Sequence, residues 1–181
     1  MIKFKKSIPS SSPNVVYDGP MLPVRNQRSL ETLAYSGLDP DIPTIFLDID
    51  GVLHRYCNET FERKELLESW LKEHSCQVVI SSNWRESHDT EHLYEALGDL
   101  IWSRIVGFTP VLEFVEGQGT REREIYEFVQ FYGLRSFICI DDSPELFSAP
   151  PAIPIIFTLP QYAITQDTMT ALHSWYANAE K

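Results

Sequence analysis

The chain of 181 residues is long enough for one domain with a sizeable core, and it contains no apolar run approaching the roughly 18 residues of a membrane span. Its net charge of −11 argues against sequence-independent nucleic-acid binding, which depends on many cations that neutralise phosphates. No apolar segment follows the basic start Met1–Lys6, so we predict no signal peptide and a cytoplasmic location.

Residues 1–43 are predicted to form an N-terminal leader, separate from a domain that spans residues 44–181. The leader contains six prolines and the run Ser10–Pro13, which is typical of an extended or loosely ordered chain, with a short helix near Ser29–Tyr35. Residues 1–39 carry a net charge of +2 and the remainder −13. The positive charge of residues 1–39 weakens the argument from net charge against a nucleic-acid substrate, but does not remove it.

From Thr44 onward, short apolar runs alternate with stretches of helical periodicity. The runs predict buried strands at residues 45–47, 77–80, 104–106, 137–140 and 153–159, the last near a sheet edge because it contains Pro154. Helical spacing of apolar residues predicts helices at residues 59–74, 88–100, 122–132 and 165–176, the last capped by Thr165. This alternation predicts an α/β fold with a mainly parallel five-stranded sheet and helices on both faces.

Three of these strands end in polar residues suited to chemistry. The pairs are Asp48 and Asp50, Ser81 and Asn83, and Asp141 and Asp142. Ligands of parallel sheets bind at the carboxyl ends of the strands. We therefore expect the three strand ends to converge on one site.

The four aspartates Asp48, Asp50, Asp141 and Asp142 would crowd negative charge that needs compensation. A hard divalent cation supplies it, and carboxylate oxygens with water suit Mg²⁺. The alternative is that each pair only forms a turn after its strand. Two pairs at matching strand ends favour the metal site.

The cysteines Cys57, Cys76 and Cys139 form no CxxC or other metal-ligand pair. Cys76 and Cys139 lie in or beside apolar runs, where a cysteine behaves as a small hydrophobe. We predict reduced thiols and no disulfide.

The segments FLDIDGVLH, VVISSNWRE, TREREI and ICIDDS follow one another in the order that the haloacid dehalogenase (HAD) superfamily uses. The chain resembles that superfamily over about residues 44–160. It is most similar to the HAD domains of the Swiss Army Knife RNA repair group. The resemblance implies a three-layer, Rossmann-like fold and a Mg²⁺-dependent phosphatase.

The resemblance also implies the roles of the acidic residues. Asp48 would be the nucleophile that forms an aspartyl phosphate, and Asp50 the general acid and base, with its backbone carbonyl as a metal ligand. Asp142 would bind the metal, with Asp141 as a second ligand or an outer-shell partner. Glu145 could hold a metal-bound water.

The same resemblance implies which polar residues contact the phosphoryl group. Ser81 would bind a phosphoryl oxygen with help from Asn83, and Ser82 replaces it if the strand register shifts by one residue. Arg121 or Arg123 would neutralise the phosphate, and Arg121 is favoured because it lies nearer the helix start.

Two further residues follow the strand ends and are candidates for substrate binding. His54 follows the first motif and could contact substrate. Arg85 follows the serine loop and could bind the phosphate or the leaving group. Its neighbour Trp84 is better read as a packing residue than as a base-stacking one.

Neither the 33 positions between Asp48 and Ser81 nor the 40 between Ser81 and Arg121 can hold a large cap domain. An open site suits a bulky substrate, and we favour a terminal phosphate of RNA or DNA, or a nucleotide. The leader could still form a partial lid. The alternatives are a phosphoprotein or small-metabolite phosphatase, or a catalytically idle HAD-like interaction module. A receiver domain is disfavoured because its acidic pair comes first in the chain. The sequence leaves the oligomeric state open.

Overall fold

The computed structural model describes residues 37–56 and 58–179, and within these ranges five strands form one sheet. Their order is β3-β2-β1-β4-β5, and each neighbouring pair is parallel. The predicted parallel α/β sheet is confirmed, with β5 at the predicted edge. The strands are β1 (Thr44–Leu47), β2 (Gln77–Ile80), β3 (Ile105–Phe108), β4 (Phe137–Asp141) and β5 (Ile155–Phe157).

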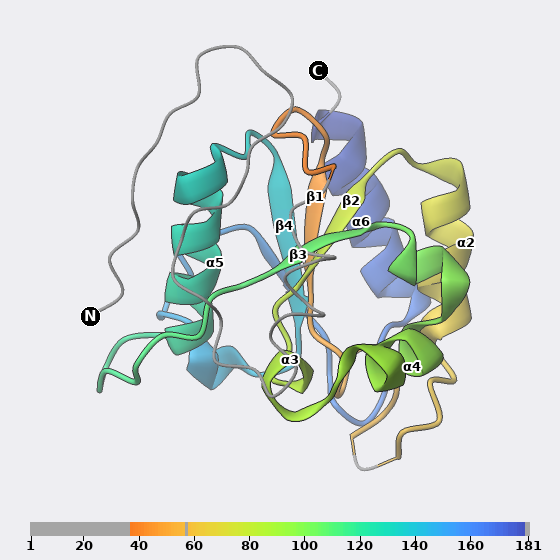
Figure 1. The fold of residues 1–181 in the computed structure, drawn as a ribbon, viewed down its shortest axis with the longest axis horizontal. Coiled ribbons are helices and arrows are strands. Elements are labelled where there is room, and N and C mark those ends of the chain that lie inside the picture. Colours follow the sequence, from red (N-terminus) through yellow and green to blue (C-terminus); the bar gives the residue numbers. More distant parts are fainter. Residues whose placement is uncertain (1–36, 57, 180–181) are drawn as a thin grey trace.

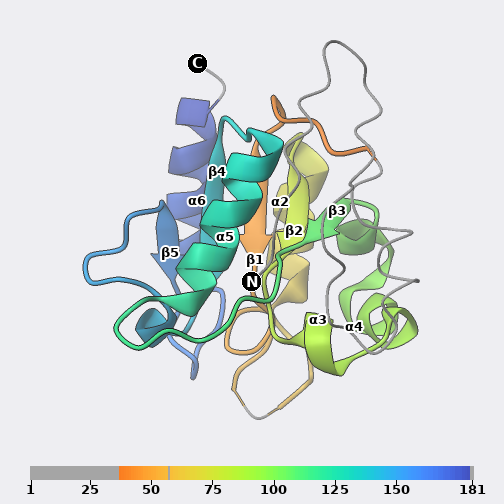
Figure 2. The ribbon, with the colours of Figure 1, turned by 60° about the vertical axis from the view of Figure 1, so that its left-hand side comes forward.

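Helices cover both faces of this sheet, which makes the three layers of the fold. Figures 1 and 2 show α5 on one face and α2, α4 and α6 on the other. The helical segments are α2 (Lys64–Glu73), α3 (Trp84–Ser87), α4 (Thr90–Trp102), α5 (Thr120–Tyr132), the 3₁₀ turn η1 (Pro144–Leu146) and α6 (Gln166–Ala179).

Side chains on one face of the three central strands continue from the core into the site. Phe46 pairs with Val79 and Cys139, and all three are buried in the cluster that packs on α5. The next residues with the same orientation along the three strands are Asp48, Ser81 and Asp141. Backbone bonds continue this pairing, since Asp48 N–H donates to Ile140 O at 3.1 Å and Ser81 N–H donates to Leu47 O at 3.0 Å.

The predicted helix at 59–74 starts five residues late. Phe61 has a φ of +53°, which breaks the helix, and Thr60 hydrogen-bonds Asn58 and Glu62 in a turn before α2. The short helix α3 was not predicted, because four residues carry no periodicity. The other helices differ from prediction by a few residues at their ends. The helix predicted near residues 29–35 lies outside the described residues.

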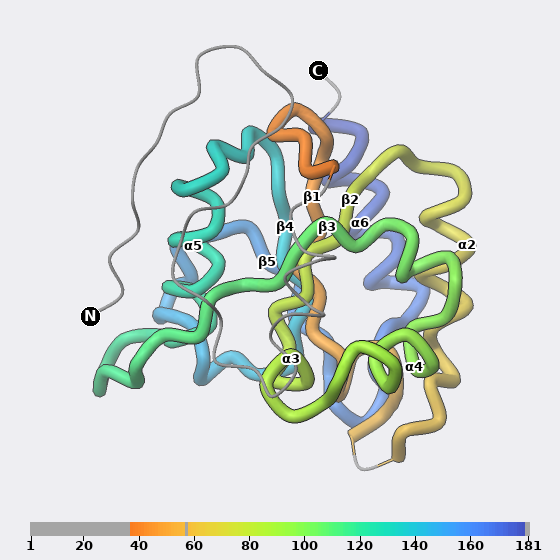
Figure 3. Tube along the Cα trace, viewed as in Figure 1, coloured from red at the N-terminus to blue at the C-terminus, as the bar shows by residue number. Residues whose placement is uncertain are grey.

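No large cap interrupts the described part of the domain. The trace in Figure 3 runs from β1 through a loop into α2, and from β2 through α3 and α4 into β3. Cys76 and Cys139 are buried free thiols, and burial raises the pKa of Cys76 to about 12 and that of Cys139 well above its usual value. Cys57 lies outside the described residues. Among residues 37–56 and 58–179, no helix is long and apolar enough to span a membrane.

Candidate active site at the carboxyl end of the sheet

Three carboxylates meet where β1 and β4 end. Asp48 directly follows β1, Asp141 is the last residue of β4, and Asp142 comes next. One carboxylate oxygen of each lies within 4.8 Å of the others. The chain builds outward from β1 to β3 in one direction and from β4 to β5 in the other. The cluster therefore lies at the switch point where α/β sheets bind ligands.

Crowding and burial disturb the ionisation of these acids. Burial raises the pKa of Asp141 to about 7, and the charge of Asp48 adds to that effect against the opposing charge of Arg121. Burial likewise raises the pKa of half-buried Asp142. A divalent cation would relieve this repulsion, and a donor set of oxygens alone suits Mg²⁺. Asp48, Asp141 and Asp142 therefore fit a Mg²⁺ ion.

The raised pKa of Asp141 predicts a pH dependence of stability in metal-free protein. Between an unfolded pKa near 3.8 and a folded pKa of about 7, the folded state binds more protons, so the free energy of unfolding falls as the pH rises through this range. Asp141→Asn should lack this contribution. Urea unfolding of both proteins across that range, with EDTA present, measures it. A difference between them that stays constant with pH would contradict the assignment.

Gly51 makes room for the carboxylate of Asp142. Its φ is +65°, and a Cβ built on it would lie 2.0 Å from Asp142 Oδ2. Any side chain here would push Asp142 away from Asp48 and Asp141. The glycine is thus required both by the backbone conformation and by the close approach of a metal-ligand candidate.

Gly51→Ala should weaken Mg²⁺ binding by about 10-fold or more, because displaced ligands and their supports typically cost this much. Isothermal titration of Mg²⁺ measures the change. Gly133→Ala is the matched control, since Gly133 has a φ of +68° and a Cβ there would meet nothing within 4 Å. Equal Mg²⁺ affinity in both variants would show that backbone strain, rather than the contact with Asp142, is the only role of Gly51.

Arg121, in the first turn of α5, ties the acidic cluster to the neighbouring loop. Its Nη1 lies 3.2 Å from Asp48 Oδ1 and donates to Asp141 Oδ2 at 2.7 Å, while Nη2 donates to Asn83 Oδ1 at 3.1 Å. The side chain is buried, and the acids around it keep its pKa above the ordinary value despite burial. A permanently charged guanidinium therefore faces the Asp48 carboxylate.

Ser81 and Ser82 differ in their surroundings. Ser81 is fully buried on the same side of the sheet as Asp48 and Asp141, and within the described residues no nitrogen or oxygen hydrogen-bonds its hydroxyl, which lies against the Cys139 thiol. The hydroxyl of Ser82 accepts a long hydrogen bond of 3.4 Å from the backbone N–H of Trp84. An unpaired buried hydroxyl is costly. Ser81 is thus the serine that lies on the side of the sheet occupied by Asp48 and Asp141.

Arg85 lies inside the protein rather than on a substrate-facing surface. Its guanidinium donates to the carbonyls of Ser81, Ser82, Thr109 and Pro110, at 2.6 to 3.3 Å, and its Nη2 pairs with Glu124 Oε2 at 2.7 Å. Arg85 and Glu124 are both buried. This placement does not support the expected contact of Arg85 with substrate, because its donors are already used within the protein.

Glu124 connects this interior pair to the site, and sequence reasoning did not select it. Its Oε2 lies 4.0 Å from Arg121 Nε, and its Oε1 accepts from Leu112 N–H at 3.0 Å. Burial raises the pKa of Glu124, while Arg85 and Arg121 oppose that shift. The spacing of Arg121 and Glu124 on one helix face was the only sequence signal.

The Asp50 carboxylate is not part of the cluster of three acids, contrary to the expected crowding of four aspartates, because it is turned towards two rings. Trp84 Nε1–H donates to its Oδ2 at 2.8 Å, and His54 Nε2 lies 3.3 Å from its Oδ1. The Asp50 side chain is 45% exposed, so it can meet a substrate, whereas His54 is buried. His54 therefore reaches Asp50 but has no open surface of its own for substrate.

Arg123 and Glu145 are not members of the cluster formed by Asp48, Asp141 and Asp142. Arg123 donates to Glu113 O at 3.1 Å in the loop before α5, so its placement does not support substrate binding. Glu145 is exposed in η1, where its charge contributes to the raised pKa of Asp142. Of the two arginines considered from the sequence, Arg121 is the one that contacts Asp48.

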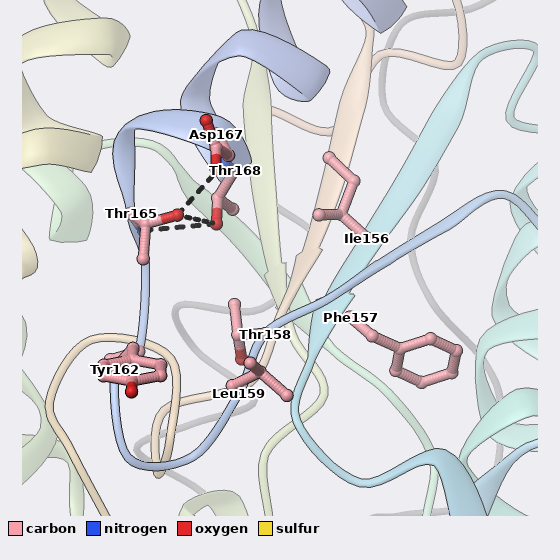
Figure 4. A pocket seen from close by; sticks show the side chains of 9 residues that line it. Ile156, Phe157, Thr158, Leu159, Tyr162, Thr165, Asp167 and Thr168 are labelled. Atoms are coloured by element: carbon pink, nitrogen blue, oxygen red, sulfur yellow. Dashed lines mark hydrogen bonds between the residues drawn. The ribbon is translucent and has the colours of Figure 1, made fainter.

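A cavity of about 270 Å³ opens between β5 and the start of α6 (Figure 4). Thr158 is on its wall, and this residue also donates to Gly51 O at 2.7 Å and to Asp141 O at 2.9 Å. None of the four aspartates lines the cavity. The cavity adjoins the ends of β1 and β4, but the aspartates there do not line it.

A comparison with known protein families found a matching family model. The family model described as the HAD domain in Swiss Army Knife RNA repair proteins matches residues 44–169, which include all the strands and the acidic cluster. Comparisons with curated proteins and with solved structures gave no significant match. On the extent of this match and the fold that accompanies it, the chain belongs to the HAD superfamily, in the family of HAD domains of Swiss Army Knife RNA repair proteins.

Proposed function

We propose that this chain is a Mg²⁺-dependent phosphomonoester hydrolase that works through an aspartyl phosphate on Asp48. Membership of the HAD superfamily implies a phosphatase-type hydrolase. One observation carries the assignment to these residues: Asp48 lies in a cluster with Asp141 and Asp142 while Arg121 contacts its Oδ1 at 3.2 Å. A carboxylate beside a metal-ligand set and a fixed cation is suited to attack phosphorus.

Phosphoryl transfer to Asp48 is the first step. A carboxylate oxygen of Asp48 forms a bond to phosphorus as the bond to the leaving oxygen breaks, and Asp50 supplies a proton to that oxygen. Arg121 and the Ser81 hydroxyl stabilise the charge on the phosphoryl oxygens. Mg²⁺, when held by Asp48, Asp141, Asp142 and the Asp50 carbonyl, supplies further charge neutralisation.

Hydrolysis of the aspartyl phosphate is the second step. Asp50, now a carboxylate, takes a proton from water as the water oxygen bonds to phosphorus, and the bond between phosphorus and Asp48 breaks. Inorganic phosphate leaves and Asp48 is regenerated. Asp50 begins and ends the cycle with its proton, so the reaction needs no other acid or base.

The preferred substrate is a terminal phosphate of a nucleic acid, or a nucleotide. The absence of a large cap in the described part of the domain leaves room for a bulky leaving group, and Asp50 is almost half exposed. The name of the matching family refers to RNA repair. We keep the cytoplasm as the expected location.

A panel of phosphate esters tests this proposal. It contains RNA with a 5′ or a 3′ phosphate, a nucleoside monophosphate, a phosphoserine peptide and a sugar phosphate, each with Mg²⁺ or with EDTA. We expect Mg²⁺-dependent phosphate release, fastest with the nucleic-acid or nucleotide substrates. Turnover of only the peptide or the sugar phosphate would favour the alternative phosphatases. Failure of folded protein to turn over any of them would favour an interaction module.

A further inference from the structure

Trp84 donates its indole N–H to Asp50, the candidate general acid, and neighbouring rings pack against the indole. The donor atom is 2.8 Å from Asp50 Oδ2, and the side chain of Trp84 is only 4% exposed. Phe61 packs edge-on against the indole at 5.7 Å, and His88 stacks on it at 4.1 Å. The rings hold the N–H in one direction, towards Asp50.

His54 lies next to the other oxygen of the Asp50 carboxyl. Its Nδ1 lies 3.0 Å from the carbonyl of Arg55, which can only accept, so Nδ1 carries a hydrogen. Its Nε2 then faces Asp50 Oδ1 at 3.3 Å, although not with hydrogen-bond geometry. An aspartate side chain that is 45% exposed would otherwise rotate freely between its rotamers.

We propose that Trp84 is a positioning residue for Asp50, an inference that rests on the proposed function. The indole holds the carboxyl in one rotamer, in which one oxygen accepts from Trp84 and the other lies next to His54. When the bond between phosphorus and the leaving oxygen breaks, the proton passes from Asp50 to that oxygen, which keeps the electron pair of the broken bond. The Trp84 N–H then stabilises the Asp50 carboxylate that remains, in the geometry needed to deprotonate water.

Trp70 shows what a tryptophan with a packing role looks like in this protein. It is 3% exposed in α2 and stacks on His74 at 4.1 Å. Within the described residues its indole nitrogen has no hydrogen-bond partner. Trp84 shares the burial and the stacking but directs its N–H to a reacting group. Packing alone therefore does not account for the bond to Asp50.

Trp84→Phe keeps a ring in place and removes the N–H. We expect kcat/KM for the phosphate of an aliphatic alcohol, whose leaving oxygen needs a proton, to fall about 10- to 100-fold. With dinitrophenyl phosphate, whose leaving group departs as an anion, the change should stay below about threefold. kcat/KM is used because it covers phosphoryl transfer to Asp48 and not the later hydrolysis. Trp70→Phe should change neither value, and Asp50→Asn should show the same selectivity with a larger loss.

A second replacement guards against a packing defect. Benzothienylalanine at position 84 has the shape of tryptophan without the N–H, and it should reproduce the selective loss. Equal losses on both substrates, or no loss on either, would overturn the positioning role. Those outcomes leave the proposed function intact if Asp48→Asn is inactive. Activity that survives Asp48→Asn would instead overturn the proposed function, and the inference about Trp84 with it.

Discussion

Asp48→Asn is expected to abolish Mg²⁺-dependent phosphate release, with a loss on the order of 10³- to 10⁶-fold, because an amide cannot form the aspartyl phosphate. The substitution keeps the shape of the side chain. It removes one partner of Arg121 and a charge that raises the pKa of Asp141, but Asp141 remains 2.7 Å from Arg121, so the metal-free variant should stay folded. Steady-state hydrolysis of a generic aryl phosphate, with thermal unfolding in EDTA, measures both effects.

Asp41→Asn is the matched control for that substitution. Asp41 is exposed before the amino end of β1, where it pairs with Arg135 at 2.9 Å. The same loss of a carboxylate there should leave activity unchanged. If Asp48→Asn kept more than a tenth of the wild-type rate in a folded protein, Asp48 would not be the nucleophile.

Arg85→Met should cost about 3–5 kcal/mol of unfolding free energy, the usual result of leaving one partner of a buried ion pair without the other. The variant would leave Glu124 buried without its 2.7 Å partner and four backbone carbonyls without their donor. The affected carbonyls belong to the loops after β2 and β3, so the two loops should loosen together. Urea unfolding measures the loss.

A double-mutant cycle separates the ion pair from the carbonyl contacts. Arg85→Met combined with Glu124→Gln leaves no unpaired buried charge, so part of the stability lost in Arg85→Met should return. An arginine that binds substrate would behave differently. Its removal would raise KM and leave the unfolding free energy within about 0.5 kcal/mol of the wild type. That second pattern would refute the interior role of Arg85.

The sequence predicted the parts of the site that follow directly from strands. Apolar runs ending in Asp48, Ser81 and Asp141 predict parallel strands with polar ends, and the observed register sets these three residues side by side. The contacts also distinguish Arg121 from Arg123, because Arg121 is buried against Asp48 while Arg123 donates to Glu113 O in the loop before α5. Local pattern and parallel topology were enough for these residues.

The remaining parts depend on loops and on long-range packing. Arg85 was expected to contact substrate, yet the short helix α3 turns it inward to Glu124, 39 residues away. Trp84 was expected to pack, and its indole does pack against Phe61, whose φ of +53° no periodicity indicates, but it also donates to Asp50. A buried arginine and a hydrogen-bonded indole are visible only once the loops after β1, β2 and β3 are placed together.

Chemical trapping of the intermediate tests the central claim most directly. Protein is mixed with Mg²⁺ and a substrate, quenched during turnover and treated with borohydride, which reduces an aspartyl phosphate to homoserine. We predict homoserine at position 48 in the peptide mass spectrum, dependent on both Mg²⁺ and substrate and absent from Asp50. Rapid turnover with Asp48 unmodified under every quench condition, or homoserine at another aspartate, would contradict the assignment of Asp48 as the nucleophile.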